Sequence, residues 1–136
     1  MLRSILSLGL VVALPLVAGA ETLDEKKFQK LMKEVGDANK RFRAAIESQD
    51  SAQVSKDAAR VSEIYKEMTG FWQQRKSEKA VKWADDSASA AALAATAAKA
   101  KDWDKVKLHL QDVTKNCKAC HDVHREKLED GSYRIK

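Results

Sequence analysis

The chain holds only two cysteines, Cys117 and Cys120, and His121 follows the second of them directly. On a helix the two thiols lie about one turn apart, and His121 lies on the same side as Cys117. This Cys-x-x-Cys-His spacing is the attachment pattern of a c-type haem: each thiol adds to a vinyl group of the porphyrin, and the imidazole ligates the iron. The sequence therefore predicts one covalent haem c per chain, held by Cys117 and Cys120, with His121 as the proximal iron ligand.

Two other uses of a Cys-x-x-Cys pair are less compatible with the surrounding sequence. A thioredoxin-like redox pair needs a strand–turn–helix context, whereas the residues before Cys117 have a helical pattern. A structural zinc site needs four ligands, which His109 and His124 could complete. His109, however, lies two helical turns before Cys117, so haem attachment is the favoured interpretation.

The first twenty residues have the features of a secretory signal peptide. Arg3 supplies a positive start, residues 5–18 are mostly apolar, and the small residues Ala18 and Ala20 suit a signal peptidase. The apolar run is short for a membrane span, although an uncleaved anchor is the alternative. We expect cleavage after Ala20, export to the periplasm, no stable membrane insertion afterwards, and a single mature domain over residues 21–136.

The charge pattern excludes one class of partner and weakly favours another. The formal net charge is +5 over 136 residues, and loss of Arg3 with the signal lowers it to +4. Lysines alternate with acidic residues, and no arginine cluster with interleaved aromatics is present, so nucleic acid is not an expected partner. Lys33, Lys115 and Lys118 lie near the predicted haem and could steer an acidic protein, although solvated lysines are the simpler interpretation.

Four segments show helical periodicity, and none shows the sustained alternation that predicts a strand. The expected helices cover residues 23–47, 51–70, 77–100 and 102–131, with Gly70 and Gly131 ending the second and the fourth. Four amphipathic helices with short connections predict an all-α, antiparallel up-down four-helix bundle. Cys117, Cys120 and His124 fall on the apolar seam of the last helix, so the haem is expected against the bundle interior.

The apolar face of the third helix is unusual because it is mostly alanine. Alanine propagates a helix well but buries little apolar area, so such a face suits a close approach by something large. Both the haem and a neighbouring helix meet that description. The residues of this face are Val81, Ala84, Ala88, Ala91, Ala95 and Ala98.

The chain resembles the class II c-type cytochromes, the cytochrome c′ group, in layout and in the residues of its last helix. Asp102 to Lys105 and Cys117 to Arg125 are similar to the last helix of that group. The resemblance implies a four-helix bundle with haem near the C-terminus. His124 is a departure, because an aromatic such as Tyr or Phe is more usual there. Arg125 corresponds to a basic residue near the proximal haem face, with an ordinary surface arginine as the alternative.

The same resemblance bears on the second iron ligand. Residues 30–36 are similar to the stretch of the low-spin members in which a methionine ligates the iron, which implies Met32 as the axial ligand. Core packing is the alternative for Met32, and Met68 is a less favoured ligand. A thioether opposite an imidazole raises the reduction potential and suits electron transfer.

These observations predict a periplasmic electron-transfer haem protein rather than an enzyme, because no catalytic constellation of side chains stands out. The alternative within the group is a five-coordinate haem that binds nitric oxide or carbon monoxide. A haem-free helical adaptor is a third possibility. Bundles of this group often form homodimers through their first two helices, but the first helix has only one clear apolar stripe, which leaves monomer and dimer open. His109 is expected to be exposed, and the three tryptophans are expected to serve packing: Trp72, Trp83 and Trp103.

Overall fold

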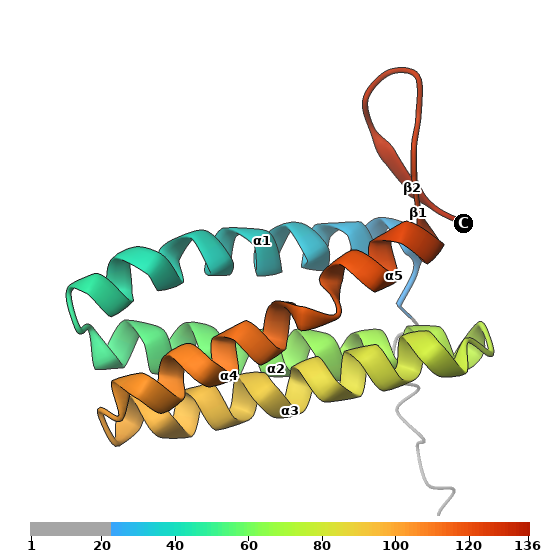
Figure 1. The fold of residues 1–136 in the computed structure, drawn as a ribbon. Helices are drawn as coiled ribbons and strands as arrows, with labels where there is room; N and C mark the ends of the chain where they lie inside the picture. The colour runs from blue at the N-terminus through green and yellow to red at the C-terminus, as the bar shows by residue number, and fades with distance from the viewer. Residues whose placement is uncertain (1–22) are drawn as a thin grey trace, which may run out of the picture.

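The computed structural model describes residues 23–136, which fold into a helical bundle with a small hairpin at its C-terminal end (Figure 1). The predicted signal peptide, residues 1–20, lies outside the described residues. Among the residues described, no helix is both long enough and apolar enough to cross a membrane. The elements are α1 (Glu25–Glu47), α2 (Ser51–Gln74), α3 (Glu78–Lys99), α4 (Trp103–Lys115), α5 (Cys117–His124), β1 (Arg125–Lys127) and β2 (Tyr133–Ile135).

The helices pack in sequence order, which confirms the predicted all-α, up-down arrangement of four helices. α1 packs on α2, α2 on α3, and α3 on α4. The α2–α3 and α3–α4 interfaces are extensive, and α5 continues beyond the end of α4 (Figure 1). The three helices α2, α3 and α4 therefore each reverse direction relative to the helix before them.

All three reversals use the same short turn. The residue after each C-cap has a positive φ, at Gln49 (53°), Lys76 (55°) and Lys101 (56°). The next residue donates its backbone N–H to the carbonyl five positions back, which satisfies an open carbonyl of the preceding helix. That same residue is the N-cap of the following helix, and the Asp50 and Asp102 side chains accept hydrogen bonds there. One residue thus ends one helix and begins the next.

The second helix is longer than the sequence predicts. Gly70 does not end it, and α2 continues to Gln74. The extension places Phe71 and Trp72 on the buried side of the bundle, at 4% and 3% exposure. Burial of two aromatic side chains outweighs the modest helix-breaking tendency of one glycine.

The last predicted helix, residues 102–131, is divided and shortened in the structure. Asn116 separates α4 from α5 with a backbone (φ −93°, ψ −5°) that departs from the α-helical values. The helix then ends at His124, and an antiparallel pair, β1 and β2, follows where no strand was expected. Gly131, predicted as a helix end, has φ +84° in the connection between the two strands. Strands of three residues are too short to show an alternating pattern.

The buried stripe of α1 is displaced by one position from the predicted one at several points. The alternating spacing of four and three residues predicts a stripe of Phe28, Met32, Val35, Asn39, Phe42 and Ile46. In the structure Met32, Asn39 and Ile46 are each only half-buried. The displacement follows from the packing: α1 has α2 as its main helical neighbour, so its stripe is centred on α2 rather than between α2 and α4. The buried residues of α1 are Phe28, Leu31, Val35, Ala38, Phe42 and Ala45.

Two ion pairs join α1 to α2. Arg41 donates two hydrogen bonds of 2.9 Å to the buried carboxylate of Asp57, which also accepts from Gln53 at 2.8 Å. Arg60 binds both oxygens of Glu34, at 2.8 and 3.1 Å. The hydrogen bonds from Arg41 hold the pKa of Asp57 below its usual value. The charged form of this carboxylate is therefore the one that the fold stabilises.

We expect Asp57→Asn to destabilise the chain by about 1–2 kcal/mol, because hydrogen bonds to a charged group are lost while Arg41 stays half in water. The lowered pKa means that the stabilising contribution of Asp57 is fully present above its unfolded value of about 3.9 and is lost as the pH falls further. Urea unfolding from pH 7 to pH 3 should therefore show the wild-type and variant stabilities converging in acid. Asp37→Asn, which removes an exposed acceptor of Lys33, is the control and should change stability little. A wild-type-to-variant difference that is independent of pH would contradict this account.

Candidate functional site

All five side chains predicted to hold the cofactor line one cavity, of about 440 Å³. Cys117, Cys120 and His121 reach it from α5, and Arg125 from the residue after that helix. Met32 reaches it from α1, which is remote from α5 in the sequence. The structure therefore brings together residues from opposite ends of the chain, and the size of the cavity is within the usual range for cofactor sites.

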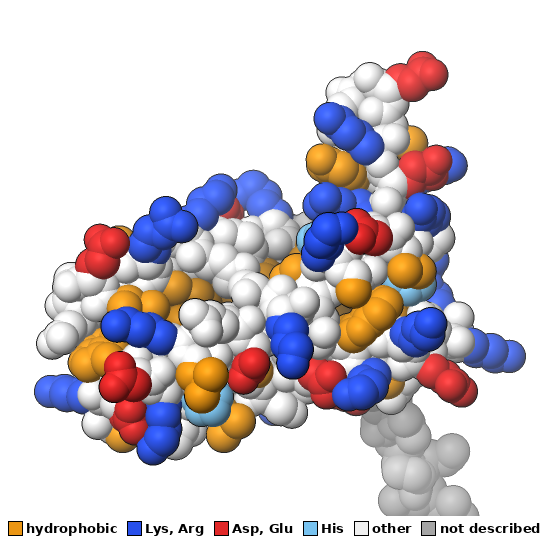
Figure 2. All heavy atoms as spheres, in the orientation of Figure 1, with side chains coloured by type: hydrophobic (Ala, Val, Ile, Leu, Met, Phe, Trp, Pro, Cys, Tyr) orange, Lys and Arg blue, Asp and Glu red, His pale blue; other side chains and the backbone are white. Residues whose placement is uncertain are grey.

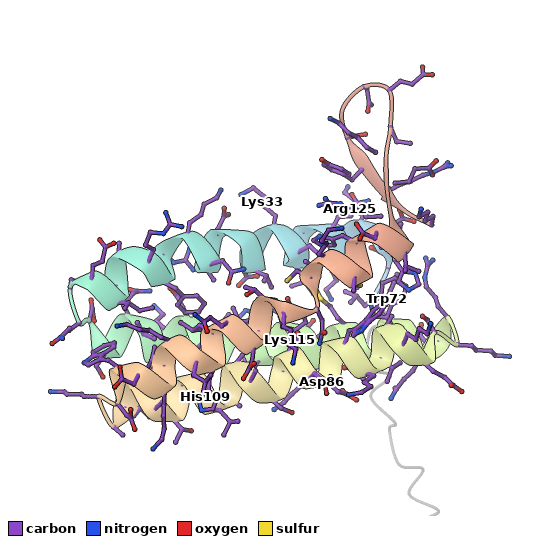
Figure 3. The ribbon with its side chains drawn as sticks, in the orientation of Figure 1. Lys33, Trp72, Asp86, His109, Lys115 and Arg125 are labelled. Carbon is purple, nitrogen blue, oxygen red and sulfur yellow. The ribbon has the colours of Figure 1, made fainter. Side chains whose placement is uncertain are left out.

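Aromatic side chains form the inner end of this cavity. The rings of Phe28 and Phe71 lie 4.5 Å apart between centroids, and Trp72 meets both rings edge to face, at 5.5 and 5.0 Å. Phe28 and Trp72 also line the cavity, and Figure 3 shows Trp72 beneath α5. The predicted packing role of Trp72 agrees with its burial, and the cavity gains a rigid apolar floor.

His124 is fixed beside the floor by three neighbours. Its ring lies 4.4 Å from Trp72 and 6.4 Å from Trp83, between centroids, and its Nε2 is 3.3 Å from the hydroxyl of Ser77. Ser77 is the N-cap of α3 but makes no side-chain cap bond there. His124 thus packs on tryptophan and uses the hydroxyl that a helix cap would otherwise take.

Tyr65 is a cavity residue whose position the sequence did not reveal. It falls on the buried stripe of α2, but its hydroxyl lies 3.9 Å from Sγ of Cys117. Burial raises the pKa of Tyr65 far above its usual value, with the neighbouring Cys117 adding to the effect. The phenol is therefore neutral at every physiological pH. A position on an apolar stripe indicates burial, but it does not tell which end of a large side chain faces a cavity.

The environment of the motif disfavours redox and zinc chemistry at the cysteines. Burial raises the pKa of Cys120 to about 11, so its sulfur is a thiol at neutral pH, whereas the nucleophile of a redox pair is a thiolate. Burial, followed by the charge of Arg125, lowers the pKa of His121, which keeps the imidazole neutral. Within residues 23–136, no group of three or more His, Cys, Asp and Glu side chains could hold a metal ion. His109, the remaining zinc candidate, is half-buried rather than exposed as predicted, and it lines a different groove.

The charged side chains that line the cavity are all cations. They are Lys33, Arg125 and Arg134, and no described carboxylate is among the lining residues. Lys33 pairs with Asp37 at 2.7 Å. The guanidinium of Arg125 lies 4.3 Å above the ring of Tyr133. This rim favours an anionic group on a ligand whose body fits the apolar floor.

The three lysines predicted near the haem have separate locations. Lys33 lines the cavity and points outward from α1 (Figure 3). Lys118 is exposed on α5 and pairs with Asp122 at 2.6 Å. Lys115 lines the groove between α3 and α4 instead, with Asp86 and His109. Figure 2 shows further Lys and Arg side chains along the outer face of α1, so positive charge is spread widely over this side of the molecule.

The alanine face of α3 borders the cavity at one end and is closed against neighbouring helices farther along. Ala84 and its neighbour Ala80 line the cavity, so this end of α3 leaves room for a large group. Ala91 and Ala98, farther along, have no exposed surface and lie at the interfaces with α2 and α4. Ser87 marks the boundary, with its hydroxyl in the cavity lining and bonded to the Val113 carbonyl at 3.1 Å.

Comparison with models of known protein families, with curated proteins and with solved structures gave no match. The fold itself is an up-down helical bundle with a C-terminal hairpin and a cavity at the hairpin end.

We expect leucine to have opposite effects at the two ends of the alanine face. Ala91→Leu should cost about 1–3 kcal/mol, because added methylenes overpack a closed interface. Ala84→Leu should be neutral or stabilise by up to about 1 kcal/mol, because its side chain enters the cavity. Urea unfolding measures both, in a Cys117→Ala, Cys120→Ala background so that no attached group fills the cavity. Equal destabilisation at the two positions would show that Ala84 borders no usable space.

Proposed function

We propose that this chain is an exported c-type cytochrome that carries one haem c and transfers electrons between protein partners. The observation that carries the proposal is the meeting of the Cys-x-x-Cys-His motif of α5 with Met32 of α1 at one apolar cavity. Cys117 and Cys120 would hold the porphyrin covalently and His121 would ligate the iron. The resemblance of the motif region to the class II cytochromes supports the same assignment.

Two properties of the cavity support the proposed haem. A porphyrin is a flat apolar ring with two carboxylates on one edge, and here an aromatic floor is combined with a rim of cations. Arg125 forms no ion pair with a carboxylate of the described residues and stacks on Tyr133, so it remains available to a carboxylate of a ligand. Its role beside the haem, which the resemblance implies, stays part of this proposal. The bound group would supply reversible one-electron exchange between Fe(III) and Fe(II).

Met32 is the proposed second axial ligand. Its side chain is half-buried and lines the cavity from α1, which does not carry the motif, so the two ligands come from separate helices. Met68 also lines the cavity, from α2, but it is 1% exposed and belongs to the packed core. Met32 and His121 would thus hold the iron from two helices, and a thioether with an imidazole as ligands raises the reduction potential, which suits electron transfer between protein partners. Without the thioether, the same cavity would suit nitric oxide or carbon monoxide, which is the alternative function.

We propose export from the sequence, and an acidic protein partner from the charged side chains of the surface. The leader over residues 1–20 and the c-type motif are mutually consistent, since c-type haem in bacteria is attached after export. Lys33 at the cavity rim and Lys118 on α5 are suited to an acidic redox partner. The large exposed apolar side chains among the described residues are on α3, α4, α5 and β2, so α1 and α2 offer no apolar dimer face of that kind.

The chain, expressed with its leader in a bacterium that matures c-type haem, should be coloured and heavier than the polypeptide by one haem. Cys117→Ala, Cys120→Ala should lose the colour and the added mass. It should also lose helicity and melt at least about 5 °C lower, because the cavity is left unfilled. Mass spectrometry, visible absorption and far-UV circular dichroism measure these properties. Lys118→Ala, at an exposed position inside the motif, is the control and should stay coloured. A colourless wild-type chain of bare polypeptide mass would favour the haem-free adaptor.

Leucine substitutions at the two methionines test the axial ligand, because leucine nearly preserves volume while removing the thioether. We expect Met32→Leu to abolish the sharp low-spin spectrum and the methionine charge-transfer feature, to lower the reduction potential, and to admit carbon monoxide. Met68→Leu should keep the low-spin spectrum. The opposite pattern would assign the ligand to Met68. A wild-type chain with a broad high-spin spectrum that shifts with nitric oxide would favour the gas-binding function.

A further inference from the structure

The C-terminal hairpin is bonded to both of the helices that carry the proposed iron ligands. On the α1 side, the amide of Gln29 donates to the carbonyl of Tyr133 at 3.0 Å, and the backbone N–H of Ile135 donates to Glu25 at 2.9 Å. On the α5 side, the backbone N–H of Lys136 donates to the carbonyl of His124 at 2.9 Å. β1 also follows α5 directly in the chain. The hairpin thus connects the two ends of the described sequence.

The hairpin contacts matter because α1 and α5 make few direct contacts with each other. α1 packs along α2, whereas no comparable packing joins it to α4 or α5 among the described elements. Figure 1 shows the hairpin at the end of the bundle where α1 and α5 come together, and Figure 2 shows apolar side chains in the space between α1 and α4. The hairpin contacts therefore account for much of the hydrogen bonding that holds α1 to the motif helix.

The bonded residues of α1 lie close to Met32 along the helix. Gln29 is three positions before Met32 and Glu25 is seven, so all three lie on the same side of α1. Gln29 and Met32 both line the cavity, as do Tyr133 and Ile135 of β2. A displacement of this side of α1 away from the hairpin would carry Met32 away from His121.

The hairpin has internal contacts that give it a defined shape. The guanidinium of Arg134 bonds to Glu126 across the two strands at 2.6 Å, and Arg125 stacks on Tyr133. Gly131, at φ +84°, allows the tight connection between the strands. A two-stranded hairpin alone is only marginally stable. The hydrogen bonds to α1 and α5 therefore stabilise the hairpin, and the folded hairpin in turn keeps those bonds in place.

We propose that the hairpin clamps α1 to α5 and thereby holds Met32 in place for axial ligation, with Glu25 and Gln29 as the positioning residues. The inference rests on the proposed function, because it assigns these residues a role in forming the methionine–iron bond. A positioning role can be distinguished from a purely structural role by what is lost when the clamp is broken. Breaking the clamp should weaken the Met32 ligand while leaving haem attachment through Cys117 and Cys120 intact.

The test compares Glu25→Ala, Gln29→Ala with the wild type, both fully loaded with haem. The double variant should lose part of the methionine charge-transfer feature and bind carbon monoxide faster, by roughly 3- to 10-fold for each hydrogen bond removed. Hydrogen exchange of the backbone amides over residues 28–35 should accelerate by a similar factor, which is a readout independent of the iron. Glu25→Gln, Gln29→Ala retains one acceptor for Ile135 and should recover part of both effects.

Lys26→Ala, Lys30→Ala is the matched control, because both lysines are exposed on the same turns of α1. It should leave the spectrum, the carbon monoxide rate and the exchange unchanged. A double variant that matches the wild type, in a chain whose wild-type spectrum shows methionine ligation, would overturn the clamp and leave the proposed function standing. A coloured wild-type chain without methionine ligation would overturn the clamp together with the ligand assignment.

Discussion

Close packing around the alanine face of α3 is the constraint on which the rest of the structure depends. Where that face is fully buried, beside Ala91 and Ala98, α2 and α4 approach α3 closely and leave no space. Small side chains permit this approach at the expense of buried apolar area, which the larger residues of α2 supply. The bundle is therefore tight at one end, and the cavity at the other end is bounded by a well-packed framework.

The cavity is formed by irregular features of three segments that lie at the same end of the bundle. α4 is interrupted at Asn116, α2 extends to bring Trp72 beneath α5, and the chain after His124 turns into a hairpin rather than continuing as helix. Among the described residues, none of these features places a carboxylate at the lining, so the charged side chains that line the cavity are cations. The cavity therefore brings together the apolar floor, the two thiols, the imidazole and the cations, although α1 and α5 are far apart in the sequence.

The buried polar groups around the motif are arranged in pairs, which limits the cost of placing them in an apolar site. Tyr65 meets Cys117, Ser77 meets His124, and Ser87 bonds to a backbone carbonyl. No buried side-chain nitrogen or oxygen lacks a hydrogen-bond partner in the described part of the chain.

The sequence alone determined the helical class, the up-down order and the residues capable of chemistry, because helix periodicity and the Cys-x-x-Cys-His spacing are local properties. Local signals failed at Gly70, where burial of Phe71 and Trp72 outweighed a glycine's tendency to end a helix. They failed again at Gly131, because the helix has already ended at His124 and this glycine lies between two short strands. Only the tertiary structure decided which residues share the cavity. The meeting of Tyr65 with Cys117, and of the hairpin with α1, depends on contacts between distant segments, and no short stretch of sequence records these.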